Sequence, residues 1–138
     1  MDEDVVSRSS GRYHEGTRII FVKPANSSFI LADQRILEKE YQVIPYLVPR
    51  PSKKFLFPLG LVQLFFFLLR HGMGSHAFVC WFGDYHAAVM VFAGKLMRKK
   101  SIIFAGGQEA VCYKELGKGV YLNPVRGAFV KYALRNST

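Results

Sequence analysis

A short polar segment, Trp81-Phe-Gly-Asp-Tyr-His86, places an aspartate and a histidine two positions apart. A carboxylate and an imidazole so close can share general acid–base catalysis, or can hold a substrate hydroxyl by hydrogen bonds. Asp84 and His86 are therefore the candidate catalytic residues, and Gly83 and Tyr85 are expected to line the same cleft. The alternative is that Asp84 only caps the helix that follows, and that His86 is a polar residue with satisfied hydrogen bonds.

A second candidate segment begins with Gly106, Gly107 and Gln108, directly after an apolar run. Two glycines at the end of a buried strand allow a ligand or a second domain to approach the backbone closely. All three residues are expected to line the cleft. The alternative interpretation of the glycine pair is a simple sharp turn.

Several kinds of site are missing from the sequence. The loop at residues 23–28 contains no glycine, so the dinucleotide-binding pattern is absent from its required place after the first strand. No phosphate-binding loop ending in Gly-Lys-Ser/Thr occurs anywhere in the chain. The four histidines and two cysteines lack metal-ligand spacing. We therefore expect no bound cofactor and no metal site.

The candidate residues lie in a chain that alternates between strand and helix patterns. Apolar runs predict four strands, and helical spacing of apolar residues predicts a helix after each of them. The strands are expected at 17–22, 42–48, 77–82 and 101–105, and the helices at 29–41, from 58 to about 71, 85–98 and 126–136. Such alternation predicts an α/β fold, a Rossmann-like parallel sheet of about four strands in the order 2-1-3-4 with helices on both faces.

Two further details refine this prediction. Pro45 cannot donate a backbone hydrogen bond, so the second strand is expected at an edge of the sheet. Ser27 or Ser28 is expected to cap the first helix. Because the chain stops after a helix, where the alternation demands another strand, the domain at 17–138 is expected to be truncated. Residues 1–16 are polar and are expected to form a disordered leader.

Composition and charge narrow the function classes. Half of the 138 residues are hydrophobic, the net charge is +9, and residues 95–138 hold nine Lys or Arg against two Glu. A basic end of this kind suits nucleic acid, an anionic membrane surface or a phosphorylated ligand, or is merely a solvated face. No recognised nucleic-acid module is present, so nucleic acid is not favoured. The polar start is no signal peptide, so we expect a cytoplasmic protein.

An apolar stretch at 55–69 is flanked by Lys53, Lys54 and Arg70. It is shorter than the roughly 20 residues that a membrane span needs. Two interpretations stay open: a core helix that packs on the sheet, and a helix that lies in the inner face of the membrane, held there by its cationic flanks.

The order of these landmarks resembles the N-terminal domain of family-4-like glycosyltransferases, which consist of two Rossmann domains. The resemblance runs from about residue 17 to the end, through the strand at 18–22, the segment at 81–87, Lys-Lys-Ser-Ile-Ile-Phe-Ala-Gly-Gly at 99–107 and Gly-Lys-Gly at 117–119. It implies transfer of a sugar from a nucleotide sugar to a glycan or lipid-linked acceptor. Asp84 and His86 would then line the acceptor site, and Gly106 and Gly107 would border the reaction centre.

In that family the nucleotide sugar is bound by a C-terminal domain that these residues do not include. The resemblance therefore implies that the chain is inactive alone. The glycine-free first loop departs from many members. Two other classes stay open: a small Rossmann-like binding module whose basic surface contacts phosphate, nucleic acid or anionic membrane, and a membrane-anchored structural protein with 55–71 inserted.

Overall fold

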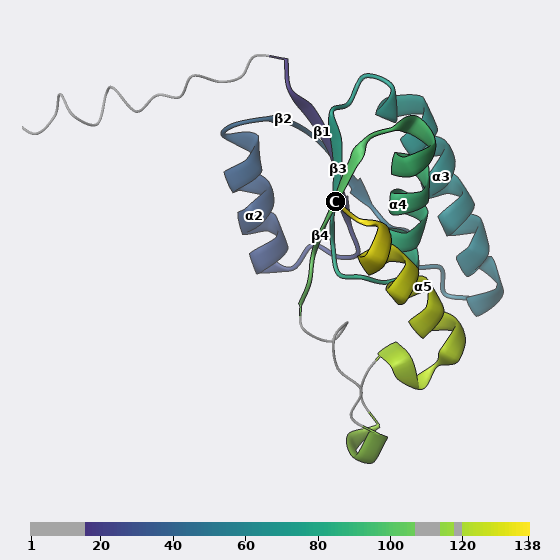
Figure 1. The fold of residues 1–138 in the computed structure, drawn as a ribbon. Helices are drawn as coiled ribbons and strands as arrows, with labels where there is room; N and C mark the ends of the chain where they lie inside the picture. Colours follow the sequence, from purple (N-terminus) through teal and green to yellow (C-terminus); the bar gives the residue numbers. More distant parts are fainter. Residues whose placement is uncertain (1–15, 107–113, 118–119) are drawn as a thin grey trace, which may run out of the picture.

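The computed structural model describes residues 16–106, 114–117 and 120–138. Its centre is one sheet of four parallel strands in the order β2-β1-β3-β4 (Figure 1). The strands are β1 (Arg18–Lys23), β2 (Gln42–Leu47), β3 (Ala77–Trp81) and β4 (Lys100–Phe104). The Rossmann-like sheet, its strand order and the edge position of the strand containing Pro45 are confirmed.

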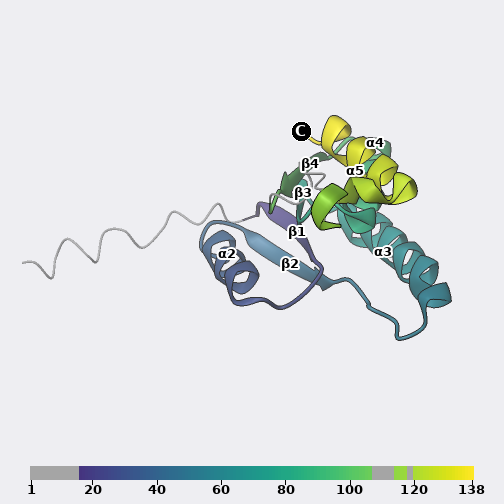
Figure 2. The same ribbon diagram turned by 90° about the horizontal axis from the view of Figure 1, so that it is seen from below.

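Helices cover both faces of this sheet. The four helices are α2 (Ser28–Glu38), α3 (Phe57–Gly72), α4 (Tyr85–Met97) and α5 (Pro124–Asn136). The turn from below in Figure 2 shows α2 on one side of the sheet and α3 with α4 on the other, where α5 packs against α4. Short 3₁₀ turns at Lys54–Leu56, Lys114–Leu116 and Val120–Leu122 complete the described elements.

Two predicted details of α2 are wrong. The helix ends at Glu38 and not at Tyr41, because residues 39 and 40 form a turn in which the Tyr41 N–H still bonds to the Leu37 carbonyl. Ser27 occupies the N-cap position, but its side chain makes no capping hydrogen bond. The Ser27 carbonyl does accept the first helical bond, from the Leu31 N–H at 3.0 Å.

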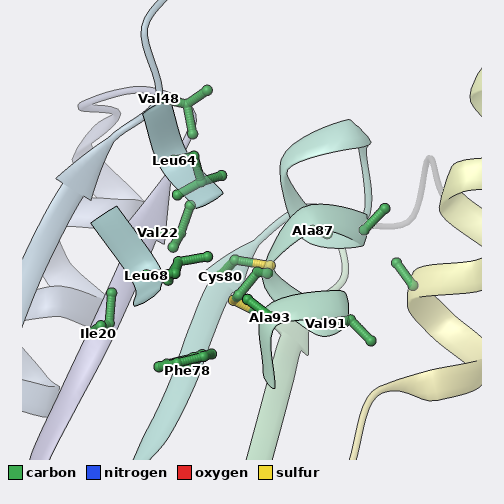
Figure 3. Packing of buried hydrophobic residues seen from close by; sticks show 13 residues of the cluster. Ile20, Val22, Val48, Leu64, Leu68, Phe78, Cys80, Ala87, Val91 and Ala93 are labelled. Carbon is green, nitrogen blue, oxygen red and sulfur yellow. The ribbon is translucent and has the colours of Figure 1, made fainter. Parts of the chain in front are cut away.

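The central strands β1 and β3 are buried on both faces because their alternate side chains enter two separate cores. On the face of α3 and α4, Ile20, Val22, Phe78 and Cys80 pack with helix residues such as Leu64 (Figure 3). On the face of α2, the intervening residues Ile19, Phe21 and Val79 pack around Ile30. A strand hydrophobic at every position is what a sheet covered on both sides requires.

The apolar helix α3 has one buried side and one exposed side. Leu64 and Leu68 are fully buried against the sheet, whereas Leu59, Val62 and Phe66 are about half exposed or more. By length and composition alone, the helical stretch Lys54–Gly72 is also able to cross a membrane. The packing of one face on the sheet agrees with the core interpretation, and the other face remains uncovered by the described residues.

The chain after α5 returns to the outer edge of the sheet. The Thr138 N–H donates to the Ser101 carbonyl at 2.7 Å, and the Ser101 N–H donates to the Thr138 hydroxyl at 3.2 Å. These two bonds place the backbone of Thr138 beside β4, on the side that faces away from β3.

Candidate functional site

A polar cavity of about 320 Å³ opens at the carboxyl end of the sheet. It is lined from the segments after β1, β2, β3 and β4 and from the starts of α3 and α5: Pro24, Val48, Pro49, Arg50, Phe57, Phe82, Gly83, Asp84, His86, Gly106 and Arg126. In the order 2-1-3-4 the connections change direction between β1 and β3, and a crevice at that point is the usual ligand site of open parallel sheets.

Four of the predicted site residues meet in this cavity: Gly83, Asp84, His86 and Gly106. Gly107 and Gln108 lie outside the described residues. The first strand contributes Pro24, although its loop lacks the glycines of a nucleotide-binding turn. Sequence reasoning therefore identified two of the segments that line the cavity, the one after β3 and the one after β4.

The turn after β3 is held in an unusual backbone conformation. Phe82 has a φ of 64°, in the left-handed region that few non-glycine residues adopt, and its N–H bonds to the Phe104 carbonyl at 2.8 Å. A Cβ added to Gly106 would lie 2.3 Å from the Phe82 ring. Gly106 is therefore required by the packing of Phe82, whatever ligand the cavity takes.

Asp84 begins α4 and binds an arginine from the far end of the chain. Its Oδ1 accepts the Tyr85 N–H at 2.8 Å, which confirms its role as N-cap. The Arg126 guanidinium donates to both carboxylate oxygens, Nε to Oδ1 at 3.0 Å and Nη2 to Oδ2 at 2.6 Å. The hydrogen bonds to Asp84 raise the pKa of Arg126 above its ordinary value, against a smaller lowering by burial, so the guanidinium is charged at neutral pH.

His86 lies in the first turn of α4, inside the predicted helix, and is 6% exposed. Its Nε2 is 2.8 Å from the Trp81 carbonyl oxygen. Since a carbonyl only accepts, Nε2 carries the hydrogen, and a neutral ring then has its lone pair on Nδ1. Asp84 is held by Arg126 and Tyr85, and the His86 ring bonds to Trp81.

Tyr85 lies beside the cavity and not in its wall. Its ring contacts Phe57 on one side, with ring centres 5.4 Å apart, and Phe129 on the other, at 5.1 Å. The three rings form a continuous aromatic bridge from the start of α3 across α4 to α5. Tyr85 was predicted to line the cleft, and in the structure it lies at the border of the cavity.

Sequence reasoning missed both arginines of the cavity. Arg126 opens α5, where Asn123 caps the helix by accepting from the Val125 and Arg126 N–H groups. Arg50 lies between two prolines after β2 and is exposed. The one available signal was that each follows a proline-containing turn in a chain with an excess of basic residues.

A third basic side chain lies at the end of β1. Lys23 is 7% exposed, and its Nζ donates to the Gln34 side chain at 2.8 Å. Among residues 16–106, 114–117 and 120–138, no three His, Cys, Asp or Glu side chains gather as metal ligands would.

Comparison of the chain with protein-family models, with curated proteins and with solved structures gives no match. The fold itself defines a Rossmann-like α/β protein with its polar cavity at the position where that architecture binds ligands.

Proposed function

We propose that this chain forms the acceptor-binding half of a glycosyltransferase with two Rossmann domains. The observation that carries the proposal is the cavity at the reversal point of a parallel sheet, which holds an imidazole, a carboxylate and two guanidinium groups. The order of landmarks in the sequence supports the same class. The nucleotide sugar is bound by a second domain outside residues 1–138, further along the same gene or on a partner chain.

In this proposal His86 acts on the acceptor hydroxyl. The Trp81 carbonyl orients the ring through Nε2, and in the proposed reaction the imidazole takes up the hydroxyl proton at Nδ1. The acceptor oxygen then bonds to the anomeric carbon of the donor sugar, and the nucleoside diphosphate leaves with the electrons of the broken bond. Asp84 is a positioning residue, because it holds Arg126 at the mouth of the cavity.

The test begins with the gene beyond the codon for Thr138 and with proteins that co-purify with the chain. We expect a second Rossmann domain from one of these sources. The complete enzyme should release nucleoside diphosphate from a UDP- or GDP-sugar when an acceptor is added, whereas the chain alone should stay at background. Turnover by the repurified chain alone, or absence of turnover with the second domain present, would overturn the proposal.

His86→Gln separates catalysis from folding in that enzyme. The glutamine amide can still donate to the Trp81 carbonyl, but it cannot take up a proton. We expect kcat to fall by about 10²–10⁴ while the melting temperature stays close to wild type. Unchanged kcat would remove His86 from the reaction and assign the proton transfer to another group of the complete enzyme.

A further inference from the structure

An apolar groove of about 570 Å³ runs over the outer side of α4. Its walls come from α3 and α5, and its floor from α4, which packs against both of them (Figure 2). Of the nine lining residues, Tyr132 alone carries a polar side-chain atom. Val62, Phe92 and Phe129 are 41–53% exposed there. Surface of this kind on a protein usually marks the binding of an apolar partner.

The groove and the polar cavity meet at the aromatic bridge. Phe57 lines the cavity, Phe129 lines the groove, and Tyr85 contacts both rings. The two spaces are therefore neighbours on either side of this bridge. A single occupant of both would need one polar and one hydrocarbon end.

The charges at the polar end favour an anion. Arg126 is neutralised by Asp84, which leaves the exposed Arg50 as the cation of the cavity wall without a described carboxylate partner. Lys53 and Lys54 follow three and four positions later in the sequence and are exposed. A phosphate or carboxylate at the cavity wall would meet Arg50, and guanidinium groups bind such anions through charge-assisted hydrogen bonds.

We propose that the groove takes the hydrocarbon chain of a single anionic amphiphile whose phosphate or carboxylate head lies at Arg50. The inference rests on the proposed function in one respect: such an amphiphile is the sugar acceptor. The occupant of the groove is a single lipid-linked acceptor molecule, and not the flat surface of a bilayer.

Binding is measured by calorimetry on the wild-type chain with dodecyl phosphate below its micelle concentration. Ala128→Trp fills the groove from its exposed wall, and Ala32→Trp is the matched control on α2, on the opposite side of the sheet. We expect Ala128→Trp to weaken binding by at least about tenfold, since a blocked groove cannot bury the chain. Ala32→Trp should bind as the wild type does.

Arg50→Gln tests the head group, with Arg35→Gln on α2 as the matched control. The loss of one charge-assisted hydrogen bond should weaken dodecyl phosphate by about tenfold. An uncharged dodecyl ether of ethylene glycol should bind the wild type and Arg50→Gln equally. Arg35→Gln should change neither affinity.

Three results would overturn the inference. Wild-type affinity in folded Ala128→Trp would exclude the groove, and wild-type affinity in Arg50→Gln would exclude the assigned head position. Binding to anionic phospholipid vesicles without binding to monomeric dodecyl phosphate would show a membrane-surface contact instead. None of these measurements uses a nucleotide sugar, so failure of the transferase assay alone would remove the proposed function and leave the groove as a lipid site.

Discussion

At the scale of single residues, Asp84 joins two parts of the fold that are far apart in sequence. It caps α4 and receives two hydrogen bonds from Arg126, 42 positions later. The same carboxylate therefore fixes the start of α4 and ties the start of α5 to the mouth of the cavity. A carboxylate with these hydrogen bonds is suited to hold the site in shape. In the proposed reaction, His86 is therefore the residue that takes up the proton.

The ion pair can be measured by a double-mutant cycle with Asp84→Asn and Arg126→Gln. Asparagine caps helices about as well as aspartate, so the cycle isolates the ionic contact. Both side chains are partly exposed, at 41% for Arg126 and 26% for Asp84, so solvent screens the attraction. We expect a coupling of about 1 kcal/mol from urea unfolding, reduced in 1 M salt. A coupling of zero at low salt would show that the ion pair does not contribute to holding α5.

His86 is predicted to matter for folding as well as for the reaction. His86→Ala removes a buried ring and leaves the Trp81 carbonyl without this bond, so the free energy of unfolding should fall by about 1–3 kcal/mol. His86→Gln should recover most of that loss. His76→Ala is the control, since that ring is exposed. Equal losses for the two alanine variants in urea unfolding would contradict the buried hydrogen bond.

The sequence predicted part of this site and could not predict the rest. Asp84 and His86 share a short segment after an apolar strand, so strand periodicity alone brought them to the carboxyl edge. The partnership of Asp84 with Arg126 depends on how α5 crosses back over α4, which no local pattern encodes. The burial of His86 was not predicted, because it depends on tertiary packing and on the bond to the Trp81 carbonyl, which the local pattern does not show.

At the scale of elements, the end of α3 packs closely on its neighbours because residue 72 is a glycine and has no side chain. A Cβ at Gly72 would lie 2.7 Å from the Phe78 ring, which is fully buried, and 2.9 Å from the Met97 terminal methyl. Gly72→Ala should therefore destabilise the fold by about 1–3 kcal/mol through overpacking. Urea unfolding measures this loss directly.

Gly60 in the same helix is the matched control. There an added Cβ would find only ordinary contacts, 3.6 Å and more from Pro49. Gly60→Ala should leave stability unchanged or raise it by up to about 1 kcal/mol, because alanine favours the helix. If Gly72→Ala were as stable as Gly60→Ala, α3 would not pack against Phe78 as closely as described.

Most elements were predictable because their patterns are strong and local. The buried strand β1 is apolar from Ile19 to Val22. Helix α4 follows an aspartate, a residue type typical of the N-cap position. The boundaries were less predictable, as the turn after Glu38 shows. Helix ends depend on which backbone groups find partners in the folded chain, and Ser27 caps only with its backbone.

At the scale of the whole molecule, the two sides of the sheet present different surfaces. The side with α3, α4 and α5 carries the apolar groove, and the carboxyl edge carries the polar cavity. Because the aromatic bridge joins the two, a lipid-linked acceptor would reach the reacting position while its chain remains shielded. The transferase experiment tests the reaction at the polar cavity. The calorimetry experiment tests binding in the apolar groove.

Both edges of the sheet are interrupted as templates for a further strand. Pro45 removes a donor along β2, and at β4 the backbone groups of Ser101 are already bonded to Thr138. A strand from another copy would therefore meet a missing or occupied partner at either edge, which disfavours edge-to-edge association into fibres.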